Sequence, residues 1–152
     1  MADQIIAGIS LELATQDNAA TAHPIFVVEQ RRRIYGMDPQ WFDTDPVWLD
    51  GYGDNVEATD EERAGLDAEY ERTGVERGGW TRTHFVDIWE FVTPFFTRRA
   101  ADAYIASNRH NLCEPRVFVH SGYRNREWQA VTAFLGEVGN AEVAQRLQQA
   151  GE

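Results

Sequence analysis

The sequence contains no lysine, only one cysteine and no long apolar run. All 14 basic residues are arginines. Arginine suits planar, bidentate contacts with carboxylates and phosphates, but a GC-rich genome produces the same bias. A single cysteine excludes an internal disulfide framework and fits a reducing compartment. No apolar stretch reaches the roughly 18 residues of a membrane span, and no signal-peptide pattern is visible. We therefore expect a cytoplasmic protein that does not contact membranes.

The sequence also lacks the short motifs of common catalytic and cofactor sites. It has no Walker A loop, no glycine-rich dinucleotide fingerprint, no serine nucleophile elbow and no EF-hand loop. His110 and Cys113 have an H-x-x-C spacing, but a structural zinc site needs four ligands and no second ligand pair follows. These absences predict no metal and no cofactor, with Cys113 as a small buried residue.

The chain does contain many large apolar side chains and more acidic than basic residues. Hydrophobic residues make up 43% of the 152 residues, and 8 Phe, 5 Tyr and 5 Trp can build a real core. The formal net charge is -11. Such a charge argues against direct, sequence-independent binding to nucleic acid and against electrostatic binding to anionic membranes.

The acidic residues are concentrated in one segment, residues 38–76. This segment holds 13 acids and 2 arginines, whereas the rest of the chain holds 12 of each and is neutral. A solvated surface that keeps the protein soluble has this composition. The alternative is an interaction surface, because aromatic residues lie between the carboxylates: Trp41, Phe42, Trp48, Tyr52 and Tyr70.

The interaction hypothesis makes the acidic segment a mimic of nucleic acid that meets a basic groove on a partner protein. Opposite potentials would accelerate encounter and set orientation more than they add affinity. The residues assigned to this contact are Asp43, Asp45, Trp48, Asp50, Tyr52, Asp54, Asp60, Glu61 and Glu62.

Hydrophobic patterning and turn residues predict four strands, over 25–35, 47–49, 82–92 and 116–121. Pro94 is expected to end the third strand. A helix is expected from Asp60 to about residue 72, because Thr59 and Glu62 form a capping-box pattern and Gly74 is a stop signal.

Two more helical regions are expected in the second half of the chain. Thr97 can cap a helix over 98–108, and Asn125 can cap one over 126–135 whose apolar face carries Trp128, Val131, Phe134 and Leu135. Gly136 and Gly139 are expected to break that helix before a last short one.

These elements predict an α+β fold, a single sheet of about four strands with helices packed mainly on one face. The strand–helix–strand order over 82–121 indicates a βαβ unit or its split version. Residues 1–22 are expected to form an N-terminal arm or short element, and residues 23–152 a single α+β domain that carries the acidic segment 38–76.

Several stretches of the chain together resemble a widespread family of small proteins encoded by bacteriophages and prophages. They lie at 24–28, 33–36, 80–83, 87–90, 94–97, 108–112, 114–119 and 123–128. The resemblance covers roughly residues 23–135, and it carries over no catalytic residue. It implies a viral accessory protein in the cytoplasm of an infected bacterium. By analogy, small acidic phage proteins often neutralise host defences, as anti-CRISPR and anti-restriction inhibitors do.

The first functional hypothesis is therefore a phage-encoded, non-enzymatic protein that binds and inhibits a host protein with a basic surface. A nucleic-acid-handling defence complex such as CRISPR-Cas is the expected target class. A protein that only packs with itself, as a homodimer, or with another viral subunit is a further alternative.

The second hypothesis is a small RNA- or nucleotide-binding protein, or a nuclease, that uses an arginine- and histidine-rich face over residues 98–126. Its candidate ligand-binding residues are Arg109, His110, Arg116, His120, Tyr123 and Arg124. A metal-independent nuclease needs two histidines, or a histidine and a carboxylate, with arginine around a phosphate. The corresponding set would be His110, His120, Glu90 and Arg116.

Overall fold

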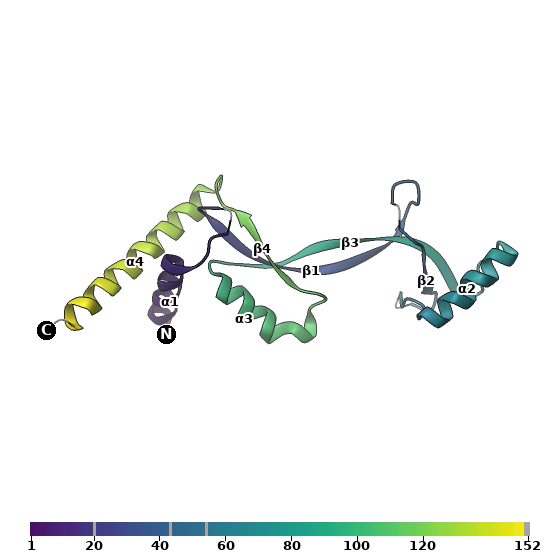
Figure 1. Ribbon diagram of the computed structural model, residues 1–152, viewed down its shortest axis with the longest axis horizontal. Coiled ribbons are helices and arrows are strands. Elements are labelled where there is room, and N and C mark those ends of the chain that lie inside the picture. Colours follow the sequence, from purple (N-terminus) through teal and green to yellow (C-terminus); the bar gives the residue numbers. More distant parts are fainter. Residues whose placement is uncertain (20, 43, 54, 151–152) are drawn as a thin grey trace. The chain divides into compact units, whose positions relative to one another are not determined.

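The computed structural model describes residues 1–19, 21–42, 44–53 and 55–150, without the side chains of residues 2, 3, 139, 140 and 142–150. Asp43 and Asp54 of the proposed contact therefore lie outside the described residues. The elements are α1 (Ala2–Thr15), β1 (Pro24–Met37), β2 (Val47–Asp50), α2 (Asp60–Thr73), β3 (Trp80–Phe95), α3 (Arg98–Asn108), the 3-10 turn η1 (Arg109–Asn111), β4 (Arg116–Ser121) and α4 (Arg126–Ala150) (Figure 1).

The four strands form one antiparallel sheet in the order β2-β3-β1-β4, which confirms the α+β fold class. β1 pairs with β4 from Pro24 opposite Ser121 to Glu29 opposite Arg116. β3 and β4 are thus parallel to each other with β1 between them, and α3 connects them. This arrangement is the split βαβ unit that the order of elements predicted.

The chain divides into two compact units. Unit 1 contains residues 1–31 and 89–152, and unit 2 contains residues 32–88. β1 and β3 each contribute residues to both units. The boundaries of the units lie at residues 31/32 and 88/89, so the expected N-terminal element, residues 1–22, belongs to unit 1. The acidic segment 38–76 lies entirely within unit 2.

The core of unit 1 lies between α3 and one face of the sheet. Phe26, Val28 and Ala101 are fully buried there. Seven partly buried side chains pack against them: Val92, Phe95, Tyr104, Ile105, Leu112, Val117 and Val119. Thr97 caps α3 as predicted, since its hydroxyl accepts a hydrogen bond from the Ala100 backbone N–H.

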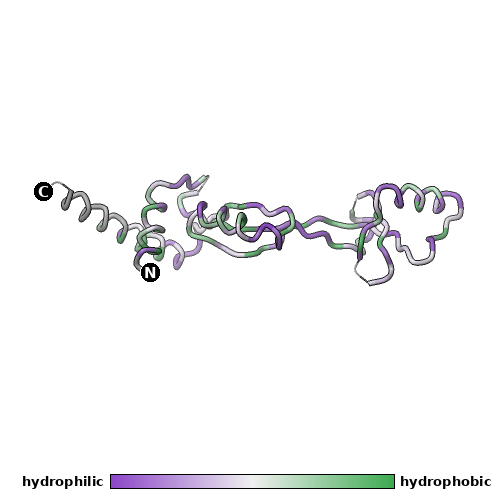
Figure 2. The backbone as a smooth tube through the Cα atoms, turned by 90° about the horizontal axis from the view of Figure 1, so that it is seen from below, coloured by the Kyte–Doolittle hydropathy of each residue, from purple (hydrophilic) through white to green (hydrophobic). Residues whose placement is uncertain are grey.

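α1 and α4 pack against each other within unit 1. Asn125 caps α4 as predicted, but the expected break at Gly136 and Gly139 is wrong, because α4 continues to Ala150. An interior glycine costs a helix about 1 kcal/mol relative to alanine, which lowers its stability without ending it. Within the described part of the chain, none of the helices combines the length and the apolar run that crossing a membrane requires (Figure 2).

The apolar face expected on α4 is only partly buried. Leu135 is buried, and Trp128 stacks on Phe96 with a ring-centroid distance of 4.3 Å. Val131 and Phe134, however, are 44% and 62% exposed, so their inward orientation was a wrong expectation. At about 100° per residue, Phe134 lies about 110° and Val131 about 50° from the middle of the side that Trp128 and Leu135 share, so both fall toward the solvent-facing edge of that side.

β3 does not end before Pro94, as was expected, but runs through it to Phe95. A proline is tolerated in a strand where its missing N–H faces no partner strand. β2 pairs with β3 only at the other end, where residues Val47 to Asp50 lie opposite Thr83 to Trp80. On the side of β3 that faces β2, Pro94 therefore has no partner residue, and its missing N–H leaves no hydrogen bond of that pairing unmade.

Unit 2 has a small core built around β2 and α2. Val47, Trp48 and Leu49 are buried in β2, and Leu66 is the buried residue of α2. The Trp48 ring packs edge-on against Tyr70 at 5.8 Å, and its Nε1–H donates a hydrogen bond of 2.8 Å to Asp67. Leu66 and Tyr70, one helical turn apart, therefore both face this core.

Both ends of α2 are capped as the sequence predicted. Thr59 and Glu62 form a complete capping box, with the Thr59 hydroxyl accepting from the Glu62 N–H and the Glu62 carboxylate accepting from the Thr59 N–H. Gly74 ends the helix with φ +68°, in the left-handed region that favours glycine.

Two glycines of α2 should respond to alanine in opposite directions. Gly74→Ala should lower the free energy of unfolding by about 1–2 kcal/mol, because a Cβ is strained at positive φ. Gly65→Ala, in the middle of the same helix with open space around its Cα, should raise it by about 0.5–1 kcal/mol. Chemical denaturation of both variants checks this pair, and two changes of the same sign would contradict the assigned cap.

Candidate functional site

Unit 2 carries most of the negative charge of the molecule. Residues 32–88 contain 14 acids and 6 arginines, a net charge of −8, against −3 for unit 1. The acids of unit 2 are not equivalent, however, because some are neutralised in ion pairs and others face solvent alone.

α2 exposes most of its acidic side chains to solvent. Asp60 and Glu61 are exposed in its first turn and have no ion-pair or hydrogen-bond partner among the described side chains. Further along, Asp67 lies 3.6 Å from Arg63, and Glu69 lies 4.0 Å from Arg77. Glu62 is held in the capping box, where hydrogen bonds from the Thr59 backbone and hydroxyl lower the pKa of its carboxyl.

The acids between β1 and β2 do not all join this surface. The loop between these strands projects to the side of the sheet opposite to α2 (Figure 1). Asp45, near the end of the loop, is close to α2, since it lines a small cavity with Arg63, Asp67 and Tyr70. Asp50 and Tyr52 lie in the turn after β2, where the Asp50 carboxylate accepts from the Tyr52 N–H at 2.8 Å.

Trp48 is a core residue and not a surface contact. Its side chain is 1% exposed, because it fills the space between β2 and α2. Tyr52 and Trp41 are the exposed aromatics of the acidic segment, at 88% and 75%. Trp48 is therefore removed from the predicted partner-binding surface. The predicted acidic residues that lie on α2 or beside it are Asp45, Asp60, Glu61 and Glu62.

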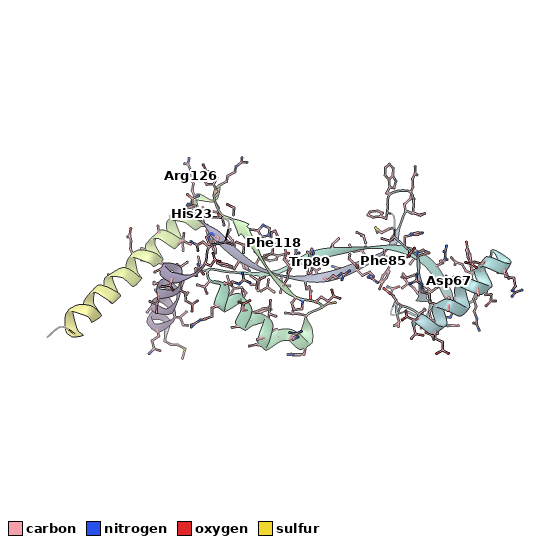
Figure 3. All side chains as sticks on the ribbon, in the orientation of Figure 1. His23, Asp67, Phe85, Trp89, Phe118 and Arg126 are labelled. Atoms are coloured by element: carbon pink, nitrogen blue, oxygen red, sulfur yellow. The ribbon has the colours of Figure 1, made fainter. Side chains whose placement is uncertain are left out.

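A network of charged side chains fixes Glu57, two residues before the α2 cap Thr59. Arg33 on β1 donates two hydrogen bonds to Asp87 on β3, at 2.8 and 2.9 Å, and a third, of 2.8 Å, to Glu57. Tyr35 donates to the same Glu57 oxygen at 2.7 Å, and the Arg33 guanidinium stacks on Phe85 at 3.7 Å. Figure 3 shows Phe85 on β3 and Asp67 on α2.

This network shifts the pKa values of its members. The hydrogen bond to Asp87 raises the pKa of Arg33, so this residue stays charged. Burial would raise the pKa of Glu57, but hydrogen bonds from Arg33 and Tyr35 outweigh it and lower that pKa below its usual value. Burial, followed by the hydrogen bond to Glu57, raises the pKa of Tyr35 to about 12.

The second candidate region is the face of the unit 1 sheet opposite to α3, here called the open sheet face. It consists of every second residue of the three strands: Ile25, Val27 and Glu29 of β1, Trp89 and Phe91 of β3, and Arg116, Phe118 and His120 of β4. Trp89, Phe91 and Phe118 are 42%, 60% and 41% exposed. Figure 3 shows Trp89 and Phe118 on neighbouring parts of this sheet.

Arg116 organises one end of the open sheet face. It donates two hydrogen bonds to a single oxygen of Glu29, at 2.9 and 2.8 Å, and its guanidinium lies 3.7 Å from the centroid of Trp89. The other Glu29 oxygen is 3.6 Å from Nε2 of His120, whose ring contacts Phe118 edge-on. Glu29 is 9% exposed, so this carboxylate is compensated by the cation beside it.

A groove with a volume of about 560 Å³ occupies the other end of this face. Its lining consists of Ile25, Val27, Phe91, Pro94, His120, Ser121, Arg124 and Asn125. Beyond it, Arg124 also lines a second hollow with His23, Tyr123 and Arg126. His23 and Arg126 lie close to the start of α4 (Figure 3). Arg124 and Arg126 have no carboxylate partner among the described side chains.

The structure brings together only part of the second predicted site. Arg116, His120 and Arg124 lie on or beside the open sheet face, with Tyr123 next to Arg124. Arg109 and His110 belong to η1, at the opposite end of β4. Arg109 and His110 therefore do not join the other candidate residues, because the six residues of β4 lie between the two groups.

The nuclease set His110, His120, Glu90 and Arg116 is not assembled. Glu90 follows Trp89 in β3, so it points to the other face, where it accepts from Gln30 at 3.0 Å. Cys113 is exposed instead of buried, because it lies in the turn after η1. Among the described residues, no three His, Cys, Asp or Glu side chains gather where they could hold a metal ion.

Sequence reasoning missed Glu29, Trp89, Phe91 and Phe118 as members of this site. Glu29 and Arg116 lie directly opposite each other in the β1–β4 register. A negative and a positive residue in two predicted strands could have indicated this ion pair, but only if the pairing of those strands had been known.

Comparison of the chain with protein-family models, with curated proteins and with solved structures finds no match. The candidate sites are therefore interpreted from their own geometry.

The raised pKa of Tyr35 predicts a specific loss of stability at alkaline pH. The unfolded chain releases the Tyr35 proton near pH 10 and the folded chain near pH 12, so the contribution of this residue is present below pH 10 and lost between these values. Denaturation of wild type and Tyr35→Phe from pH 9 to 12 should show a shallower decline for the variant. Tyr52→Phe, at an exposed site, should follow wild type, and equal slopes for all three proteins would refute this assignment.

Proposed function

We propose that this chain is a phage-encoded, non-enzymatic binding protein that acts in the cytoplasm of a host bacterium. It blocks a host protein whose basic surface normally holds nucleic acid. A defence complex of the CRISPR-Cas or restriction type is the proposed class of target. The contact is the exposed acidic side of α2, with Asp45 beside it.

The observation that carries this proposal is the exposure of uncompensated carboxylates on a helix that is fixed in place. Leu66 anchors α2 from within the core, and the hydrogen bond between Trp48 and Asp67 holds its orientation. The backbone of Asp60 and Glu61 is thereby ordered before binding, which lowers the entropic cost of forming a complex.

An exposed aromatic residue of unit 2, Tyr52, supports a protein partner over a small ion. Tyr52 exposes most of its surface in the same unit as the acids, whereas the exposed Trp41 belongs to the loop between β1 and β2 and is not assigned to the contact. The Tyr52 ring lies over Gly79, 3.1 Å from where a Cβ would be, so the glycine leaves room for it. Aromatic residues of this kind supply much of the energy of protein interfaces, while the surrounding charges steer the encounter.

Charge reversal on α2 tests the proposed function. The immobilised protein should capture nucleic-acid-binding proteins from a bacterial lysate, and added double-stranded DNA and salt should both reduce the capture. Asp60→Lys combined with Glu61→Lys should abolish it. In bacteria carrying a defence system that the wild type inhibits, the same double variant should no longer raise the plating efficiency of a sensitive phage.

The matched control is a double charge reversal on unit 1. Glu127→Lys combined with Glu137→Lys changes the net charge by the same amount at exposed positions of α4. This control should retain capture. If both double variants lose capture equally, only the net charge of the protein matters. If both retain capture, the assignment of the contact to α2 is wrong. Circular dichroism of each variant confirms that α2 and α4 remain folded.

A further inference from the structure

The groove on the open sheet face combines flat aromatic walls with an unpaired cation. Phe91 is 60% exposed and forms one wall with Pro94, while the His120 ring lies across the groove and is backed by Phe118. The floor consists of Ile25 and Val27 of the central strand. Arg124 lines the end toward α4.

The charges around the groove favour an anionic ligand. Glu29, whose carboxylate lies 3.6 Å from Nε2 of the groove residue His120, is already neutralised by Arg116. Toward α4, Arg124 and Arg126 lie beside His23 and His120, with Glu127 as the neighbouring acid in the first turn of α4. The guanidinium of arginine matches the geometry of phosphate and carboxylate groups, which it can bind through two parallel hydrogen bonds. Aromatic rings on an open sheet face are, in turn, a common platform for stacking nucleobases.

We propose that this groove binds a nucleoside monophosphate. The base lies against Phe91 and the His120 ring, and the phosphate lies at Arg124. The site is separate from the acidic side of α2 and does not depend on the function proposed for that surface.

Charge favours a single nucleotide over a long strand. The groove is open to solvent, and its volume of about 560 Å³ is sufficient for one nucleotide. The net charge of −11 repels a polyanion in proportion to its charge, so the penalty grows with every added phosphate. A mononucleotide keeps both favourable contacts with the smallest repulsion.

Isothermal titration calorimetry with AMP, GMP, CMP and UMP, and with the matching nucleosides, tests this site. At least one nucleotide should bind saturably and more tightly than its nucleoside. Arg124→Gln should weaken nucleotide binding about tenfold and leave nucleoside binding unchanged. Phe91→Ala should weaken both about 5- to 30-fold, because stacking is lost.

Two variants outside the groove serve as controls. Arg109→Gln removes an exposed arginine at the other end of β4, and Phe134→Ala removes a phenylalanine of similar exposure on α4. Both should bind nucleotides like wild type. Because Phe91 and Arg124 are exposed, their variants should fold, and circular dichroism checks that they do.

Three results would overturn the proposal. The first is no saturable binding of any of the four nucleotides. The second is unchanged affinity in both groove variants. The third is binding of a ten-nucleotide single strand without binding of any mononucleotide, which would make the face a strand-binding surface. The charge reversals on α2 should leave nucleotide binding intact, so failure of one proposal is distinguishable from failure of the other.

Discussion

The three hydrogen bonds donated by Arg33 are the interaction on which unit 2 depends. This unit buries few apolar side chains, and the guanidinium connects a residue of β1 with Asp87 of β3 and with Glu57, just before α2. Glu57 is also bridged to Leu49 of β2 through its backbone. With its side chain and backbone both held, the chain enters the capping box at Thr59 in a defined direction. Arg33 thus sets where the chain enters α2, and Leu66 and the Trp48–Asp67 hydrogen bond then hold the helix on the core.

The two candidate surfaces differ in which charged side chains are paired with an opposite charge and which are not. In unit 2 the acids closest to the strands are compensated by Arg33, whereas those at the start of α2 are left to solvent. In unit 1 the situation is reversed, since the carboxylate of Glu29 is compensated by Arg116 and the uncompensated charges are Arg124 and Arg126. Each unit thus presents one sign of charge beside exposed aromatic rings.

Local signals in the sequence were sufficient for most of the elements. Thr59 with Glu62, Gly74 and Thr97 mark helix ends through hydrogen bonds within a few residues, and these were confirmed. The misplaced features depend on contacts distant in sequence. Pro94 is tolerated because β2 pairs elsewhere on β3, and Trp48 is buried because α2 covers it. The Glu29–Arg116 pair and the stacking of Arg116 on Trp89 require three strands in register, which no local pattern specifies.

Unit 1 is discontinuous along the chain, and this has a consequence for biosynthesis. Phe26 and Val28 leave the ribosome before the 57 residues of unit 2, whereas Ala101, Val117 and Val119, which cover them, are translated last. Unit 2 has its complete sequence first and can fold while the remainder is still being made. The two segments of unit 1 are then joined by a folded unit 2 instead of by 57 unfolded residues. The entropic cost of closing a loop of that length is therefore no longer part of forming the core of unit 1.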